Sequence, residues 1–173
     1  MNLIENKERI FSQVAQAMET ANRTDQVNVI AVTKYVGIDQ AKVLVDTGVR
    51  HIGENRVDKF LEKYQALKDE GLTWHLIGSL QRRKVKEVIN YVDYFHALDS
   101  MKLAQEIQKR ASHPIKCFIQ VNISGEESKH GFAPEELDAL LPEIENLDNL
   151  QIVGLMTMAP FEASQDELQA IFA

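Results

Sequence analysis

Residues 27–34, VNVIAVTK, and residues 51–55, HIGEN, are the two stretches that decide the fold. Both are short and apolar, and the first is rich in β-branched residues, which is typical of buried strands in a parallel sheet. A helical pattern follows the second stretch, with apolar side chains on one face at Val57, Phe60, Leu61, Tyr64 and Leu67. Such spacing indicates an amphipathic helix that packs on the strands before it.

The same alternation continues along the chain. The later strand-like segments are TWHLIG (73–78), YFHALD (94–99), KCFIQVN (116–122) and LQIVGLMTM (150–158). Each precedes a helical pattern, and we expect Ser79 to cap the helix that follows the first of them. A further helix is predicted over residues 2–20, with Asn2 and Glu5 in capping-box spacing. Six strand–helix units after a leading helix predict a parallel α/β sheet, either open and doubly wound or a (β/α)8 barrel.

The length of 173 residues suits one domain but is short for a barrel, which usually takes about 250 residues. The last predicted helix has a capping box at Ser164 and Glu167, yet the sequence stops at Ala173 after about two and a half turns of 3.6 residues. We therefore expect a single domain over residues 1–173 that is truncated at its C-terminus, and both architectures remain open at this point.

Composition excludes several classes of protein. Apolar residues make up 45% of the chain, so global disorder is excluded. A net charge of −7 argues against nucleic-acid binding through a general basic field. The single Cys117 cannot form an internal disulfide, and no segment is long and apolar enough for a membrane span. Because the N-terminus also lacks the apolar run of a signal peptide, we expect a cytoplasmic protein.

Polar residues close the predicted strands, at the edge where parallel α/β folds carry their functional groups. They are Lys34, Asn55, Ser79, Asp99, Asn122 and Thr157. Lys34 follows an apolar run, and a desolvated lysine can form an imine with an aldehyde. The alternative is a lysine that extends from a strand end into water, and periodicity alone favours it.

His75 lies beside Trp74 in an apolar strand, where a hydrogen-bonded core histidine is more common than a ligand or a base. The other four histidines are scattered along the sequence, so a zinc site has no support. A basic run at Arg82, Arg83, Lys84 and Lys86 is expected at a helix start, either as a solvated face or as an anion or partner surface. The segment from Ser128 to Gly131 is either an anion-binding or closing loop or simply flexible.

Several motifs together resemble the pyridoxal phosphate homeostasis protein family. They are AVTK (31–34), GEN (53–55), WHLIGSLQ with Lys84 (74–84), IQVN (119–122), E-x-S-K-x-G (126–131) and GLMTM (154–158). The resemblance implies a (β/α)8 TIM barrel of the alanine racemase N-terminal type, here incomplete with about six units. It also implies that pyridoxal 5′-phosphate (PLP) is held as an internal aldimine on Lys34, with Asn55, His75 and Met156 lining the cofactor.

The sequence departs from the family pattern at Ser79, where histidine is frequent, and at Arg82 and Arg83, where smaller polar residues are usual. The family's later segments, which contact the phosphate and the pyridine nitrogen, are not in this sequence, so we expect weakened PLP binding. The resemblance implies a role in PLP homeostasis without turnover. The expected partners are PLP and PLP-dependent apo-enzymes, with no nucleic acid or membrane, and the chain is expected to be a monomer or weak dimer.

An enzymatic role is the alternative, as a PLP-dependent amino-acid racemase or lyase or as a Schiff-base aldolase using Lys34. Such an enzyme needs a second acid or base facing Lys34. Tyr35 adjoins Lys34, but alternation along a strand predicts that it points to the opposite side.

Overall fold

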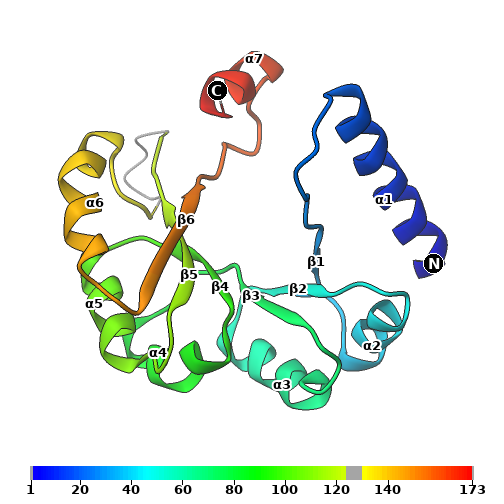
Figure 1. Cartoon of the computed structure of the whole chain (residues 1–173), viewed down its shortest axis with the longest axis horizontal. Helices are drawn as coiled ribbons and strands as arrows, with labels where there is room; N and C mark the ends of the chain where they lie inside the picture. Colours follow the sequence, from blue (N-terminus) through cyan, green and yellow to red (C-terminus); the bar gives the residue numbers. More distant parts are fainter. Residues whose placement is uncertain (1, 124–129, 173) are drawn as a thin grey trace.

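A computed structural model of the chain describes residues 2–123 and 130–172, and its centre is a six-stranded parallel sheet (Figure 1). The strands are β1 (Ile30–Val32), β2 (His51–Glu54), β3 (Thr73–Leu76), β4 (Tyr94–Leu98), β5 (Ile115–Gln120) and β6 (Leu150–Met156). The helices are α1 (Leu3–Thr20), α2 (Ile38–Asp46), α3 (Val57–Leu67), α4 (Arg82–Val88), α5 (Met101–Arg110), α6 (Leu137–Glu145) and α7 (Gln165–Phe172), with 3-10 turns η1 (Ile89–Tyr91) and η2 (Pro134–Glu136). The order of strands in the sheet is their order in the chain, which confirms the six predicted strand–helix units.

The sheet curves as an open arc, with α2 to α6 on its convex side (Figure 1). Trp74 identifies the helix-facing side, because its ring packs edge-on against Phe60 and Tyr64 of α3 at centroid distances of 5.5 and 5.3 Å. Its register partner on β2 is Ile52, which is fully buried on the same side. Since side chains alternate along a strand, His75 faces the opposite, concave side.

Two predicted boundaries were wrong for reasons that the structure shows, and the other strands end one or two residues before their predicted ends. The first strand was expected over residues 27–34, but β1 covers only Ile30–Val32, because its ladder with β2 begins at the pair Ile30 and His51. The helix expected to begin after Ser79 begins instead at Arg82, with Gln81 in an extended conformation at its N-cap. Leu80 lies between Ser79 and Gln81 and is buried in the core. The extended connection before α4 places its side chain there.

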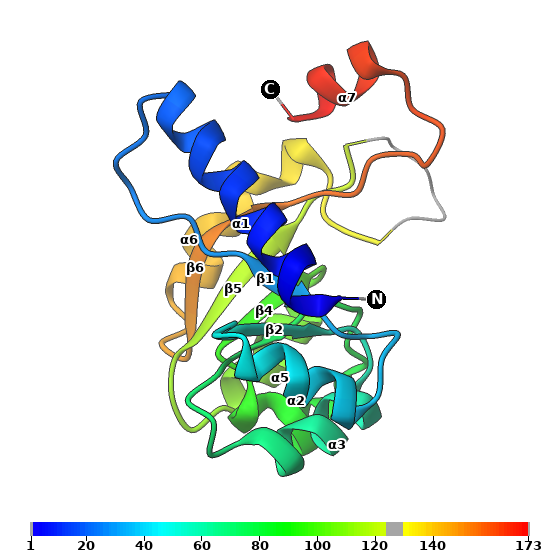
Figure 2. The same ribbon diagram turned by 90° about the vertical axis from the view of Figure 1, so that its right-hand side faces the viewer.

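Of the two terminal helices, α7 lies apart from the helices that cover the sheet (Figure 2), whereas α1 contacts α2. The predicted caps are present: the Glu5 N–H donates to Asn2 Oδ1 at 3.3 Å, and the Glu167 N–H donates to Ser164 Oγ at 3.4 Å. Neither α1 nor α7 has a buried residue, so the apolar stripe of α1 makes no core. Within the described residues, no helix is long and apolar enough to cross a membrane.

Candidate functional site

Lys34 lies at the carboxyl end of β1, one residue beyond Thr33, and is half-buried. The Val36 N–H donates to the Thr33 carbonyl at 3.1 Å, so Lys34 and Tyr35 occupy the middle of a turn. Among the described residues, no carboxylate forms an ion pair with Lys34 Nζ. The amine therefore lies at the predicted edge, and no acidic side chain of the described residues holds it there.

Tyr35 does not point away from Lys34 as the sequence predicts. Lys34 Nζ lies over the Tyr35 ring, 4.9 Å from its centroid, while the Tyr35 side chain is 89% exposed. The prediction was wrong because both residues belong to a turn, where the alternation of an extended strand no longer applies.

Asn55 follows β2 directly, on the strand next to β1, so the structure brings Asn55 and Lys34 to adjacent strand ends. Asn55 lines a hollow of about 350 Å³ together with Ser79, Gln81 and Lys84. Gly78 lies directly against the Asn55 backbone, because a Cβ at Gly78 would overlap the carbonyl oxygen of Asn55. The close approach of these two loops therefore requires glycine.

His75 lies below this edge, in the middle of a ladder of three histidines on the concave side of the sheet. His75 Nε2 is 2.9 Å from His51 Nδ1, and His75 Nδ1 is 2.8 Å from His96 Nε2. The ring also stacks on Tyr94 at 4.6 Å. Burial, reinforced by His96 and His51, lowers the pKa of His75 to about 3. His75 is thus a neutral, hydrogen-bonded core histidine, and His51 and His96, scattered in sequence, are its partners.

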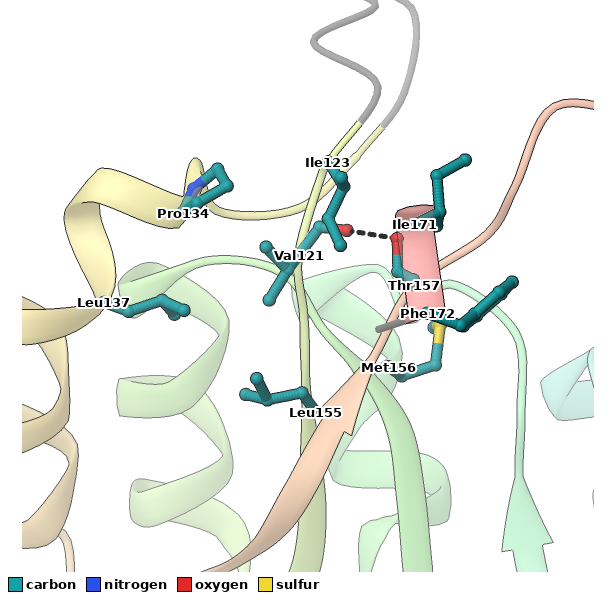
Figure 3. Close-up of a pocket in the computed structure, with 9 residues that line it drawn as sticks. All are labelled: Val121, Ile123, Pro134, Leu137, Leu155, Met156, Thr157, Ile171 and Phe172. Carbon is teal, nitrogen blue, oxygen red and sulfur yellow. Dashed lines mark hydrogen bonds between the residues drawn. The ribbon is translucent and has the colours of Figure 1, made fainter. Parts of the chain in front are cut away.

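Met156 ends β6, at the opposite edge of the sheet from β1. It lines an apolar cavity of about 590 Å³ between the ends of β5 and β6, helix α7 and the start of α6. Figure 3 shows Leu155 pointing toward Leu137, while Met156 lies on the other side, below Phe172. Thr157 at the same strand end is held by its hydroxyl, which donates to the Val121 carbonyl at 2.8 Å (Figure 3).

Asp99, another polar residue at a strand end, takes part in a local contact. Asp99 accepts a hydrogen bond from the Ser100 hydroxyl at 3.1 Å. In the basic run, Arg82 and Arg83 are exposed, and Arg83 Nε donates to Gln81 Oε1 at 2.9 Å, whereas Lys84 turns into the hollow beside Asn55. Most of the E-x-S-K-x-G motif, residues 126–129, lies outside the described residues. No cluster of three His, Cys, Asp or Glu able to hold a metal occurs within the described ranges.

A buried polar cluster behind Lys34 and Asn55 was missed by the sequence analysis. Thr33, Glu54 and Lys63 are 1%, 0% and 2% exposed. The Thr33 hydroxyl donates to Glu54 Oε1 at 2.6 Å, and Lys63 Nζ donates to the Thr33 carbonyl at 2.9 Å and forms an ion pair with Glu54 Oε1. The signal was present: Lys63 falls three residues after Phe60 and four before Leu67, on the apolar stripe of α3.

Comparison with known proteins shows which class of fold the chain has. The family model of the alanine racemase N-terminal domain matches residues 6–172. An alanine racemase from Clostridium difficile has the same fold, with a TM-score of 0.67 over 84% of this chain and 40% of the racemase at 18% identity. The fold is thus the TIM-barrel type expected from the sequence, seen here as an open six-stranded sheet.

Closer relatives then identify the family. A pyridoxal phosphate homeostasis protein from Aquifex aeolicus is 38% identical across 99% of this chain and 77% of its own length. The counterpart from Pseudomonas aeruginosa is 32% identical across 99% and 76%. PipY from Synechococcus elongatus, solved with PLP bound, has a TM-score of 0.84 at 31% identity and covers 99% of this chain and 77% of PipY. The chain belongs to the pyridoxal phosphate homeostasis protein family.

Proposed function

We propose that this chain binds PLP at the carboxyl edge of its sheet and acts in PLP homeostasis. The observation that carries the proposal is Lys34, a half-buried primary amine at the end of β1 that no described carboxylate neutralises. The relatives named for PLP homeostasis and the PLP-bound PipY structure support the same cofactor.

The residues present fit such a cofactor. PLP supplies an aldehyde whose carbon forms a double bond to a lysine Nζ while the aldehyde oxygen leaves as water. Lys34 provides that amine, and the lining of the adjacent hollow offers the Asn55 amide and the Lys84 ammonium as donors. We propose that Asn55 orients the cofactor beside Lys34, and that His75 and Met156 line its concave side. The neutral His75 adds no charge there.

We propose a holding role without turnover, with PLP-dependent apo-enzymes in the cytoplasm as recipients of the cofactor. Reversible bond formation at a single lysine is sufficient for holding and release. One observation favours an enzyme instead: the Tyr35 ring lies beside Lys34 Nζ and offers a phenol as a second acid or base. Racemisation or elimination of amino acids that depends on both Lys34 and Tyr35 would establish that alternative.

Trapping of the bound cofactor tests the proposal. The purified chain is mixed with PLP, reduced with borohydride and digested, and mass spectrometry locates the pyridoxyl label. We expect the label on Lys34 and its loss in Lys34→Met. Lys116→Met is the matched control, because Lys116 Nζ contacts the Tyr94 hydroxyl at 3.2 Å on the concave side, away from the carboxyl edge. A label that persists elsewhere in Lys34→Met, at the stoichiometry of the unchanged chain, contradicts the proposal.

A further inference from the structure

The buried cluster of Thr33, Glu54 and Lys63 joins three elements at one point. Thr33 directly follows β1, Glu54 is the last residue of β2, and Lys63 comes from the middle of α3. Glu54 Oε1 accepts hydrogen bonds from both the Thr33 hydroxyl and the Lys63 ammonium. Glu54 Oε2 is buried and has no hydrogen-bond partner among the described residues. An arrangement that leaves one carboxylate oxygen unsatisfied is not one that maximises stability.

The geometry of the cluster bears directly on the two residues that follow it. The Thr33 carbonyl, which accepts from Lys63 Nζ at 2.9 Å, belongs to the peptide group that leads into Lys34. The same oxygen accepts the Val36 N–H and so closes the turn that contains Lys34. Glu54 is fixed by the same contacts, and Asn55 is the next residue. The cluster therefore sets the orientation of the peptide group before Lys34 and anchors the strand end before Asn55.

We propose that the Thr33–Glu54–Lys63 cluster is a positioning device that holds the Lys34 amine in the orientation in which it reacts with the aldehyde of PLP. The inference rests on the proposed function of Lys34. Buried charges are costly to place, and an apolar pair of similar volume often supports a fold equally well. If these positions only had to stabilise the fold, apolar side chains would thus be sufficient. Orientation of the peptide group before Lys34 instead requires the ammonium donor and its carboxylate partner.

The decisive variant is the double substitution Glu54→Leu with Lys63→Met, which removes both charges and keeps the core filled. We expect it to fold, with a Tm close to that of the unchanged chain, and to react at Lys34 at least about tenfold more slowly, because small misplacements of a reacting group are costly. The probe is pyridoxal, which lacks the phosphate, followed by borohydride and peptide mass spectrometry. The label on Lys116 is the internal reference. A general loss of structure would raise the labelling of Lys116, whereas a loss of positioning would lower the labelling of Lys34 alone.

Two further pairs of variants sharpen the test. Thr33→Val removes the hydroxyl and is expected to slow the reaction of Lys34 with pyridoxal. Thr33→Ser keeps the hydroxyl and is expected to react at the rate of the unchanged chain. The matched control is Lys59→Met with Glu62→Leu, which removes an exposed ion pair of 2.7 Å from the same helix and is expected to leave the rate unchanged. A double variant of Glu54 and Lys63 that labels Lys34 at the unchanged rate overturns the inference. Absence of label on Lys34 in the unchanged chain instead overturns the proposed function.

Discussion

His75 Nδ1 lies 2.8 Å from His96 Nε2, across two neighbouring strands, and the other nitrogen of His75 is bonded to His51. A neutral His75 satisfies both contacts by donating through one nitrogen and accepting through the other. Protonation would place two donors on one ring and bring a charge into a buried site. The ladder therefore depends on neutral histidines.

Stability should consequently fall on mild acidification. Burial first, then the neighbouring His96 and His51, lowers the pKa of His75 from 6.5 to about 3. Between these pH values the unfolded chain binds a proton that the folded chain does not, so the contribution is complete above pH 6.5 and is lost as the pH falls toward 3. From pH 6.5 to 5.0 we expect a loss of about 2 kcal/mol in the free energy of unfolding through His75, at about 1.4 kcal/mol per unit. Urea denaturation at both pH values measures it.

His75→Gln should weaken this pH dependence, while His51 and His96, whose pKa values burial also lowers, keep their share of it. His113→Gln, at an exposed position, should leave it unchanged. An equal slope in His75→Gln and the unchanged chain would show that His75 is not the group responsible.

Gly78→Ala should destabilise the chain, because its new Cβ overlaps the Asn55 carbonyl oxygen and forces the two strand-end loops apart. Overpacking of this kind costs about 1–3 kcal/mol. Gly37→Ala is the matched control, since nothing lies within 4 Å of a Cβ at that position. Chemical denaturation of both variants gives the comparison, and equal losses in the two would contradict the predicted close approach.

Cys117 should be inert to thiol reagents in the folded chain. It is fully buried on β5, and burial raises the pKa of its thiol to about 12, so the reactive thiolate is scarce at pH 8. We expect reaction with a disulfide reagent to be on the order of 100-fold slower in the folded chain than in guanidinium chloride. Because Cys117 is the only cysteine, absorbance reports this site alone. Rapid stoichiometric reaction under native conditions would contradict the burial.

Backbone amides of α1 should exchange with solvent much faster than those of α5. Helix α1 has no buried residue, whereas α5 buries Leu103, Ala104 and Ile107 against the sheet. Local opening of a helix without core contacts costs little free energy. Hydrogen–deuterium exchange followed by mass spectrometry compares the two helices, and equal protection would show that α1 is held by contacts other than core packing.

Local sequence signals were sufficient for the type and order of the elements but not for their limits. Each apolar β-branched run and each helical stripe became the element it predicts, because burial on a parallel sheet imposes those patterns. The limits of β1 depended on where its partner strand β2 begins, at His51. The local sequence around β1 holds no information on that position. The start of α4 likewise depended on burial of Leu80.

The positions of the candidate residues at strand ends were predictable one by one, but the contacts around them were not. Lys34 and Asn55 close strands and are found at adjacent strand ends. The histidine ladder was invisible because it depends on the register that pairs Gly53 with His75, far apart in sequence. The contact between Thr33 and Glu54 was hidden for the same reason, although a lysine on the buried stripe of α3 signals that some buried acid lies opposite.

The order of the strands also bears on how the chain folds. Among the described strands, each one after β1 pairs with the strand that precedes it in sequence. The paired residues are 19–22 apart in the pairings from β1 to β5 and 35–36 apart in the pairing of β5 with β6. Because the entropic cost of loop closure rises only slowly with loop length, all these pairings have a similar and modest cost. None of the six described strands needs a partner that is distant in sequence before it can pair. A chain emerging from the ribosome can therefore add one strand–helix unit after another onto an existing edge, with β1 and β2 as the first template.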